Sequence, residues 1–452
     1  MICRSIILLL LVTAPTTAVA QDAHYWTYQY GTRANLLGGA VIGSVLDVSA
    51  TFYNPGALSL IVDPDIIATS KVFELSSVKI TPDVGAQVSL DNLRLDLAPG
   101  FVGGLLPFRF LGDHVLGYSL FTRYKFKSTL DAGGTGSLDE LPQVGVPGDY
   151  LGLLVNEEDV SEFWVGITWS VPLGRRMGIG ITQFGAYRSQ KSKTRGLFEG
   201  FTDAAEGALS TREEGFSYWH FRFLWKAGLT LEWQGVSLGL TVTTPSVGVL
   251  SGGRALVNIA QFNVDIDGDG TPDPEFVASV QDGLSASYKS PWSVGLGATY
   301  SPRELTTLHV SAEYFGKVEE STVMELDPFE AQSIGDTVTE VLTQRLDDVL
   351  NFGVGLEHDF KPTLGGYAAF RTDFSAKPAD APLDVAFSSW DIFHLSGGTR
   401  FRIGTADLTL GLSYGWGSRR VEIGRPDEFS VVEPRALDVK YRTLRLILAF
   451  AL

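Results

Sequence analysis

Alternation of side-chain size is the feature of this sequence that most constrains its fold. Residues Leu408 to Trp416 read Leu-Thr-Leu-Gly-Leu-Ser-Tyr-Gly-Trp, with a large apolar side chain at every even position and a small or polar one at every odd position. Successive side chains of a strand point to opposite faces, so this segment predicts a strand with one apolar and one slender face. Residues Trp292 to Tyr300 and Leu350 to Leu356 repeat the pattern. A soluble sandwich would be expected to carry long charged residues on its outward face, whereas glycine, serine and threonine suit a barrel lumen with lipid outside.

The same criterion, applied along the chain, gives about fourteen candidate strands. Their approximate centres are Thr69, Leu93, Tyr118, Ile167, Gly180, Leu224, Leu240, Leu296, Val310, Val354, Ala369, Gly398, Leu412 and Leu446. The predicted fold class is therefore all-β, a transmembrane antiparallel β-barrel. An even number of strands returns both ends of the barrel to the same side of the membrane.

The connections between candidate strands alternate between short and long. Tight turns are expected at 172–175, 233–235, 301–304, 361–363 and 404–406. Long polar stretches lie between them, at 129–160, 190–215, 251–275, 319–340, 376–391 and 417–437. Outer-membrane barrels show this alternation, with short periplasmic turns and long outer loops. Within the long stretches, Leu197–Leu209 and Val338–Val349 have apolar spacings that predict short helices, either as a lid over a ligand groove or as local loop packing.

The first twenty residues have the form of a secretory signal. Arg4 supplies a positive start, Ile6 to Val12 an apolar run, and Ala18-Val19-Ala20 a small-residue cleavage site. The run is too short for a membrane-spanning helix. We therefore expect a signal peptide at 1–20, an N-terminal plug or hatch at 21–63, and the barrel at 64–452.

Charge and cysteine content exclude several functions. The formal net charge is −17, so nucleic acid is an unsuitable partner. The single cysteine, Cys3, lies within the signal, which leaves the mature chain without a disulfide or a thiol nucleophile. No catalytic motif is present, and alternation places His358 on the opposite face from Glu357 and Asp359. We predict that the protein is not an enzyme.

The segment before the first strand, Tyr30 to Leu60, is not strand-like. It is rich in glycine and alanine and contains Asp47-Val48-Ser49-Ala50 followed by Phe52-Tyr53-Asn54-Pro55-Gly56. These residues resemble the hatch of the FadL family of outer-membrane transporters for long-chain fatty acids and hydrocarbons (OMPP1/FadL/TodX type). The family usually has alanine where this chain has Gly56.

The resemblance implies a location in the outer membrane of a Gram-negative-type bacterium and passive uptake of hydrophobic small molecules. It implies hatch gating, with Asp47, Tyr53, Asn54, Pro55 and Gly56 as hatch residues. It also implies lateral exit into outer-membrane lipid at the third strand, here about Val115 to Tyr124. Two alternatives remain open: an inert stabilising plug, and a FadL-like barrel that binds a protein partner as a secretion component of the PorV type.

Two further sets of residues are candidate sites. Alternate oxygen ligands with a glycine between them suit a calcium loop, and Asp265, Asp267, Asp269, Thr271 and Asp273 have this spacing. The usual glutamate at position twelve is replaced by Phe276, so a plain acidic turn is the alternative. No cofactor is required.

Polar residues predicted to face the lumen form the second set, namely His394, Arg400, Arg402 and Arg445. Such charges either pair with one another or bind a carboxylate head group, and pairing is the favoured interpretation.

Overall fold

A computed structural model gives the fold of the chain. It describes every residue except 1–22, 62–66, 69–71, 83–89, 99, 107–111, 138–147, 203–206, 264–273, 304, 334, 336, 379–389, 405, 424–434 and 452. The signal-peptide prediction, the strand centre at Thr69 and the five calcium-loop residues lie outside the described part. No helix among the described residues is long and apolar enough to cross a membrane.

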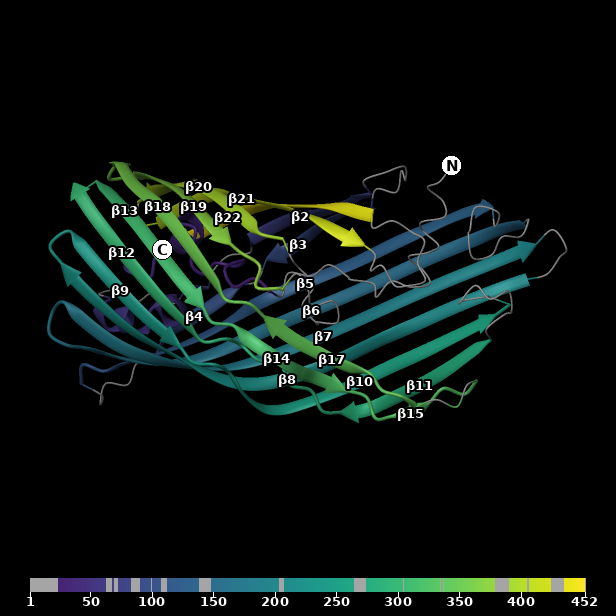
Figure 1. Cartoon of the computed structure of the whole chain (residues 1–452). Coiled ribbons are helices and arrows are strands. Elements are labelled where there is room, and N and C mark those ends of the chain that lie inside the picture. The colour runs from purple at the N-terminus through teal and green to yellow at the C-terminus, as the bar shows by residue number, and fades with distance from the viewer. Residues whose placement is uncertain are drawn as a thin grey trace.

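One large antiparallel sheet forms the wall of the molecule (Figure 1). Its first strands are β1 (Ile67–Ala68), β2 (Val72–Pro82), β3 (Leu90–Ala98), β4 (Phe101–Leu106), β5 (Val115–Ser137), β6 (Gly148–Pro172), β7 (Met177–Thr202), β8 (Gly207–Trp233) and β9 (Val236–Thr243). The remaining strands are β10 (Val247–Phe262), β11 (Glu275–Leu284), β12 (Ser293–Arg303), β13 (Thr306–Phe315), β18 (Val349–Lys361), β19 (Leu364–Asp373), β20 (Ile392–Ile403), β21 (Ala406–Ile423) and β22 (Arg435–Ala451).

The wall closes into a ring of fourteen strands among the described residues. The sheet has eighteen strands, but β1 and β2, β3 and β4, β9 and β10, and β11 and β12 are consecutive halves of interrupted barrel strands. The first barrel strand pairs with the last, because β2 forms a ladder with β22 from Phe73–Leu446 to Pro82–Leu437. The predicted strand number is confirmed, and thirteen of the fourteen predicted centres lie in strands that the structure describes.

The predicted tight turns lie between consecutive strands, whereas several predicted loops are wrong. Strands β5 to β8 are 23 to 27 residues long, so most of 129–160 and 190–215 forms long β-hairpins that extend well beyond the shorter strands (Figure 1). Neither predicted helix forms. Leu197 lies in β7, Leu209 lies in β8, and Val341–Leu346 is strand β17.

A separate hairpin of β14 (Val318–Glu325) and β17 packs against the sheet that β10 and β11 add beyond the short strands. A smaller pair, β15 (Phe329–Glu330) and β16 (Thr337–Val338), continues it. The side chain of Gln344 ties the hairpin to the main chain before β12: it accepts from Lys289 N and donates to Lys289 O, both at 2.8 Å.

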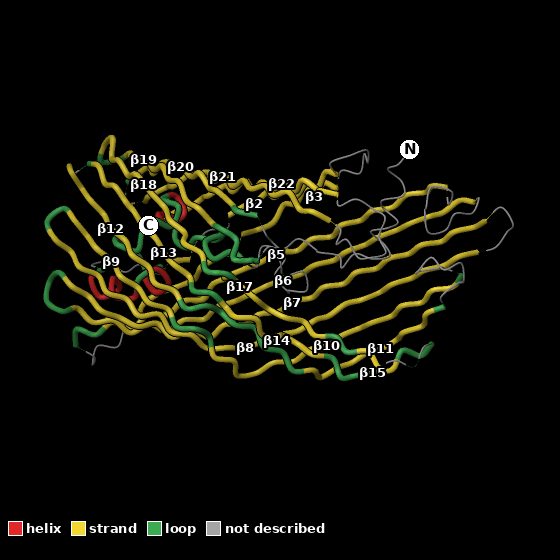
Figure 2. Tube along the Cα trace, in the orientation of Figure 1, coloured by secondary structure: helices red, strands yellow, loops and turns green. Residues whose placement is uncertain are grey.

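The two faces of the wall have the predicted characters. On β21, Leu410, Leu412, Tyr414 and Trp416 are exposed, whereas Thr409 and Ser413 are buried. The buried face encloses a plug made of α2 (Thr32–Leu36), α3 (Ala50–Tyr53), the 3-10 helix η1 (Pro55–Leu60) and the turns between them. Figure 2 shows these helices inside the barrel, towards the end that carries the short turns. The N-terminal hatch is therefore present.

Candidate functional site

The hatch lies directly on glycines of the lumen face. A Cβ atom added to Gly178, Gly228 or Gly239 would overlap Gly56, Asn54 or Ile42 of the hatch, respectively. The slender face that the sequence shows along its strands is thus what allows the hatch backbone to approach the wall.

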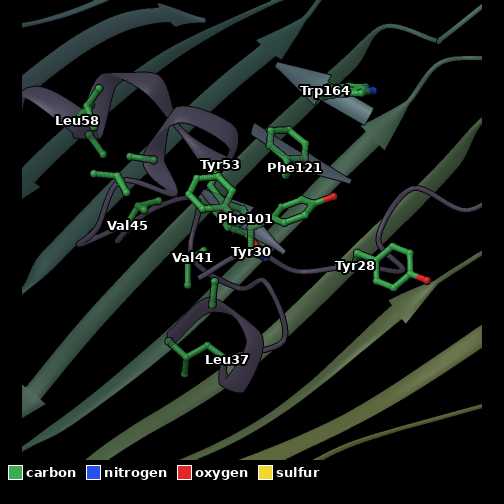
Figure 3. Close-up of a cluster of buried hydrophobic side chains, with 14 of the residues drawn as sticks. Tyr28, Tyr30, Leu37, Val41, Val45, Tyr53, Leu58, Phe101, Phe121 and Trp164 are labelled. Atoms are coloured by element: carbon green, nitrogen blue, oxygen red, sulfur yellow. Dashed lines mark hydrogen bonds between the residues drawn. The ribbon is translucent and has the colours of Figure 1, made fainter. Parts of the chain in front are cut away.

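Aromatic and aliphatic side chains fill the space between the hatch and the strands that follow it (Figure 3). Tyr30 packs on Phe121 with ring centroids 4.5 Å apart, and Phe52 meets Phe121 edge to face at 5.3 Å. Trp164 and Phe184 of the wall join the same cluster, with ring centroids 5.0 Å apart.

Two of the predicted hatch residues make hydrogen bonds that hold the hatch in place. Asn54 donates through Nδ2 to the carbonyls of Ile42 and Leu229, each at 3.0 Å, and accepts through Oδ1 from Gly56 N at 3.1 Å. The Tyr53 hydroxyl donates to Gln29 and accepts from Tyr30 N, each at 2.8 Å. Burial raises the pKa of Tyr53 well above its usual range, so its hydroxyl stays protonated and keeps its donor.

The other predicted hatch residues have local roles. Asp47 accepts from Ser49 N at 2.8 Å at the start of the α3 turn. Pro55 is the first residue of η1, where a missing N–H costs nothing. A Cβ on Gly56 would lie 2.6 Å from Gly178 O and 2.7 Å from Gly228 O, so this position requires glycine.

A cavity of about 90 Å³ lies between the hatch and the middle of the long strands. One side is aromatic, with Trp26, Tyr28, Phe52, Trp164 and Tyr288. Five basic side chains and two carboxylates line the rest: Arg123, Arg188, Arg222, Lys226 and Lys289, with Glu162 and Glu313. The cavity is therefore mainly aromatic with a surplus of positive charge.

The charges in the cavity are ordered by pairing and by ring contacts. Glu162 lies 2.7 Å from Arg222 and 3.4 Å from Arg188, and the Arg188 guanidinium lies 3.9 Å from the centre of the Tyr288 ring. Lys226 lies 3.7 Å from Glu313 and 4.9 Å from the Phe52 ring. Among the described residues, buried Nη1 of Arg222 has no hydrogen-bond partner, so a donor remains available to a ligand.

Sequence reasoning missed this charged group, although a signal was present. From Tyr218 to Lys226 of β8, large aromatic residues occupy the odd positions 219, 221, 223 and 225. The even positions therefore face the lumen, and Arg222 and Lys226 are among them.

The wall is interrupted beside the cavity, at the third barrel strand. In the described part of the chain, the ladder between β4 and β5 ends at Phe101 and Phe121, and β3 forms no ladder with β5. The register of β5 with β6 shifts between Thr122 and Tyr124, which makes Arg123 a β-bulge. Arg123 turns inward, donates to Tyr25 O at 2.5 Å, and lies 5.7 Å from the centre of the Trp164 ring.

The four predicted lumen charges do not form one site. Arg445 is buried and bonds Glu74 at 2.9 Å, Arg400 lies 2.7 Å from Asp359, and Arg402 bonds Asp407 at 2.8 Å near the short-turn end. His394 is buried 4.0 Å from Asp373. Each of the three arginines therefore pairs with a carboxylate of the protein, as the favoured interpretation has it. None of the four lines the cavity.

The residues of Glu357-His358-Asp359 have separate partners, as alternation predicts. Glu357 bonds Arg33 at 2.7 Å, His358 bonds Thr306 at 2.8 Å, and Asp359 pairs with Arg400. No group of residues that would hold a metal ion occurs within the described part of the chain. The calcium-loop residues lie outside that part, so calcium binding stays a prediction.

A closed barrel whose lumen holds an N-terminal plug, with an aromatic cavity above it, has the architecture of a plugged membrane channel. No protein-family model matches the chain, and no curated protein matches its sequence. Solved protein structures, in contrast, do match the fold of the chain.

The chain is similar to the P. putida toluene transporter TodX, with a TM-score of 0.59 and 13% identity over 93% of this chain and 97% of that chain. It is similar to a Pseudomonas aeruginosa FadL homologue, with a TM-score of 0.56 and 12% identity over 94% and 99%. The CymD monoaromatic hydrocarbon channel matches with a TM-score of 0.50 and 11% identity over 92% and 97%. The chain therefore shares the fold of the FadL-type channels.

Proposed function

We propose that this protein is an outer-membrane transporter of the FadL type that takes up hydrophobic small molecules. The observation that carries the proposal is the position of the aromatic cavity, which lies above the hatch and beside the interruption of the wall at β5. The outward faces of the short strands are apolar, which suits lipid, and the solved structures with this fold include hydrocarbon channels.

Lateral exit is favoured by energetics. Release of an apolar molecule into water costs about 0.8 kcal/mol for each exposed methylene. The bulge at Arg123 lies where the ladder of β5 with β4 ends, so the cavity and the interrupted wall share this residue. A molecule that leaves there reaches lipid without crossing water.

The cavity also favours ligands with an anionic end. Five basic side chains line the cavity with two carboxylates, and one Arg222 nitrogen has no hydrogen-bond partner among the described residues. Since an uncompensated buried charge is costly, a carboxylate on the ligand would stabilise the site. The volume is smaller than the roughly 150 Å³ cavity that holds benzene in an engineered protein, so a long ligand requires the hatch or the N-terminal segment to move.

The alternative of a protein-binding component of the PorV type predicts a lumen without an apolar cavity. The aromatic cavity supports transport instead. The inert-plug alternative differs from gated transport in one respect: an inert plug does not have to move during uptake.

A reversible lock on the hatch tests the proposal. Thr182 of β7 donates to Thr51 O of the hatch at 2.8 Å, and the mature sequence lacks cysteine, so Thr51→Cys/Thr182→Cys introduces two thiols, one on the hatch and one on the adjoining wall strand, whose cross-link is measured before uptake. A matched control is Ser396→Cys/Ser413→Cys, which joins two wall strands whose hydroxyls are 3.4 Å apart.

Cells that lack the protein and express each variant are given a labelled long-chain fatty acid or a labelled monoaromatic hydrocarbon. We expect oxidation to stop uptake through the hatch-locked variant, reductant to restore it, and the wall-locked control to be unaffected. Undiminished uptake with a fully formed hatch disulfide would show that the hatch does not gate transport. Equal uptake of every ligand with and without the protein would exclude the transport function.

A further inference from the structure

The outward face of strands β5 to β8 changes character where the apolar belt ends. Phe163 of β6 lies opposite Tyr187 of β7, and the Tyr187 and Trp219 rings stack with centroids 6.3 Å apart. All three side chains are exposed. Exposed aromatic residues at the end of an apolar belt are typical of the membrane–water interface.

Two outward-facing rows of residues follow this aromatic edge. The strand register aligns Lys125, Ser161 and Ser189 in the first row, and Lys127, Asp159, Lys191 and Ser217 in the second. Lys125, Lys127, Asp159 and Lys191 are exposed, while the residues between them, such as Val160 and Gln190, are buried. We call these the membrane-proximal basic rows.

These two rows hold more basic than acidic residues. They hold three lysines and one aspartate, whereas further along the hairpins basic and acidic residues lie directly opposite each other. There Glu157 pairs in register with Lys193, and Arg195 with Glu213. A local surplus of lysine is notable in a chain whose formal net charge is −17.

The one acidic residue in the rows neutralises its neighbours weakly. Lys127 lies 3.9 Å from Asp159, and both side chains are 52% exposed. Exposed ion pairs of this kind contribute between zero and about 1 kcal/mol, so a multiply charged anion competes with them easily. Serine hydroxyls beside the lysines supply additional hydrogen-bond donors to phosphate oxygens.

We propose that the membrane-proximal basic rows bind the phosphate groups of a phosphorylated glycolipid in the outer leaflet. The inference rests on the membrane location given under the proposed function. Continuity with the lipid-facing belt selects a lipid as the occupant, because a lipid whose chains cover the belt places its head group on these rows. Each lysine near an anionic lipid surface contributes about 1 kcal/mol, which makes three lysines sufficient for selective binding.

The test compares lipid binding by purified full-length protein in detergent. The probes are bis-phosphorylated lipid A and the same lipid after removal of both phosphates, with native mass spectrometry as the readout. The variant is Lys125→Gln/Lys127→Gln/Lys191→Gln. The control is Lys193→Gln/Arg195→Gln, which removes basic charge from the same strands beyond the two rows. Heat-dependent migration in gels shows whether each variant folds.

We expect the wild type and the control to prefer the phosphorylated lipid, and the triple variant to lose at least about tenfold in its affinity. Equal binding of the two lipids by the wild type would overturn the proposal, as would a folded triple variant that binds like the wild type. An equal loss of affinity in the control would mean that surface charge in general causes the effect, and this outcome would overturn the proposal as well. Uptake is measured separately, so lipid binding without uptake would contradict the proposed transport and leave this inference standing.

Discussion

The side chain of Asn54 donates to the carbonyl of Leu229, 3.0 Å away, and so joins the hatch to strand β8. The same nitrogen bonds Ile42 O, and Oδ1 accepts from Gly56 N. One amide therefore fixes two turns of the hatch and one wall strand.

Replacement of Asn54 by alanine is expected to loosen the hatch. The change leaves buried carbonyl and N–H groups without partners, at about 1–3 kcal/mol each. We expect more frequent open events in planar-bilayer conductance recordings. Asn35→Ala is the control, since the hydrogen bonds described for its amide go to Gln29 O and Gly31 O, both within the N-terminal segment. Equal conductance of the two variants would contradict a specific role for the wall bond.

Replacement of Gly56 by alanine is expected to displace the hatch, although alanine is the residue usual in the resembling family. The new Cβ would lie 2.6 Å from Gly178 O, and overpacking of this kind costs about 1–3 kcal/mol. Limited proteolysis of the hatch would show the displacement. Gly207→Ala is the control, because its nearest new contact is an ordinary 3.6 Å to Phe201. If the hatch of the variant resists protease as well as the wild-type hatch does, the wall strands shift to accommodate the new Cβ and the hatch is not displaced.

The ion pair between Glu74 and Arg445 joins the first barrel strand to the last, and both residues are buried. Glu74→Gln leaves a buried guanidinium uncompensated, which costs about 3–5 kcal/mol. We expect the barrel to unfold at a lower temperature, measured as the loss of heat-dependent gel migration. Asp407→Asn breaks the more exposed pair with Arg402 and is expected to cost less than about 1 kcal/mol. Similar unfolding temperatures for the two variants would mean that the Glu74 pair adds little.

Calcium removal tests the predicted loop of Asp265 to Asp273. If the alternate oxygens bind the ion, a chelator should make this loop sensitive to protease, and added calcium should restore resistance. The variant Asp267→Asn/Asp269→Asn should be sensitive in both conditions. Protease resistance that calcium does not alter would identify the segment as a plain acidic turn.

The strands of the lipid-facing belt could be predicted because their two faces differ sharply. Leu412 and Tyr414 must face outward, while Gly411 and Ser413 must face the lumen. The hatch motif was likewise recognisable, since Asn54, Pro55 and Gly56 are adjacent in sequence and act together in the structure.

The long hairpins could not be predicted in the same way, because 129–160 and 190–215 are rich in charged residues and lack a regular alternation of large apolar with small side chains. The helix prediction at Leu197–Leu209 was wrong for a related reason. Leu197, Phe201 and Leu209 are separated by multiples of four, and such spacing also places side chains on one face of a strand. The cavity depends on Glu162, Arg188 and Arg222, which lie on three strands, and only the strand register brings them together.

Arg445 has a consequence for how the molecule assembles. While Nε bonds Glu74 of the first barrel strand, Nη1 donates to Thr27 O at 2.6 Å, across 418 positions of sequence. Arg371 holds the same carbonyl from another strand at 3.0 Å. One side chain, Arg445, therefore contacts both the first barrel strand, where the wall closes, and the N-terminal segment in the lumen. We expect ring closure and plug docking to be a single late, slow step of folding, because contacts between the two ends of a chain carry the largest loop-closure entropy.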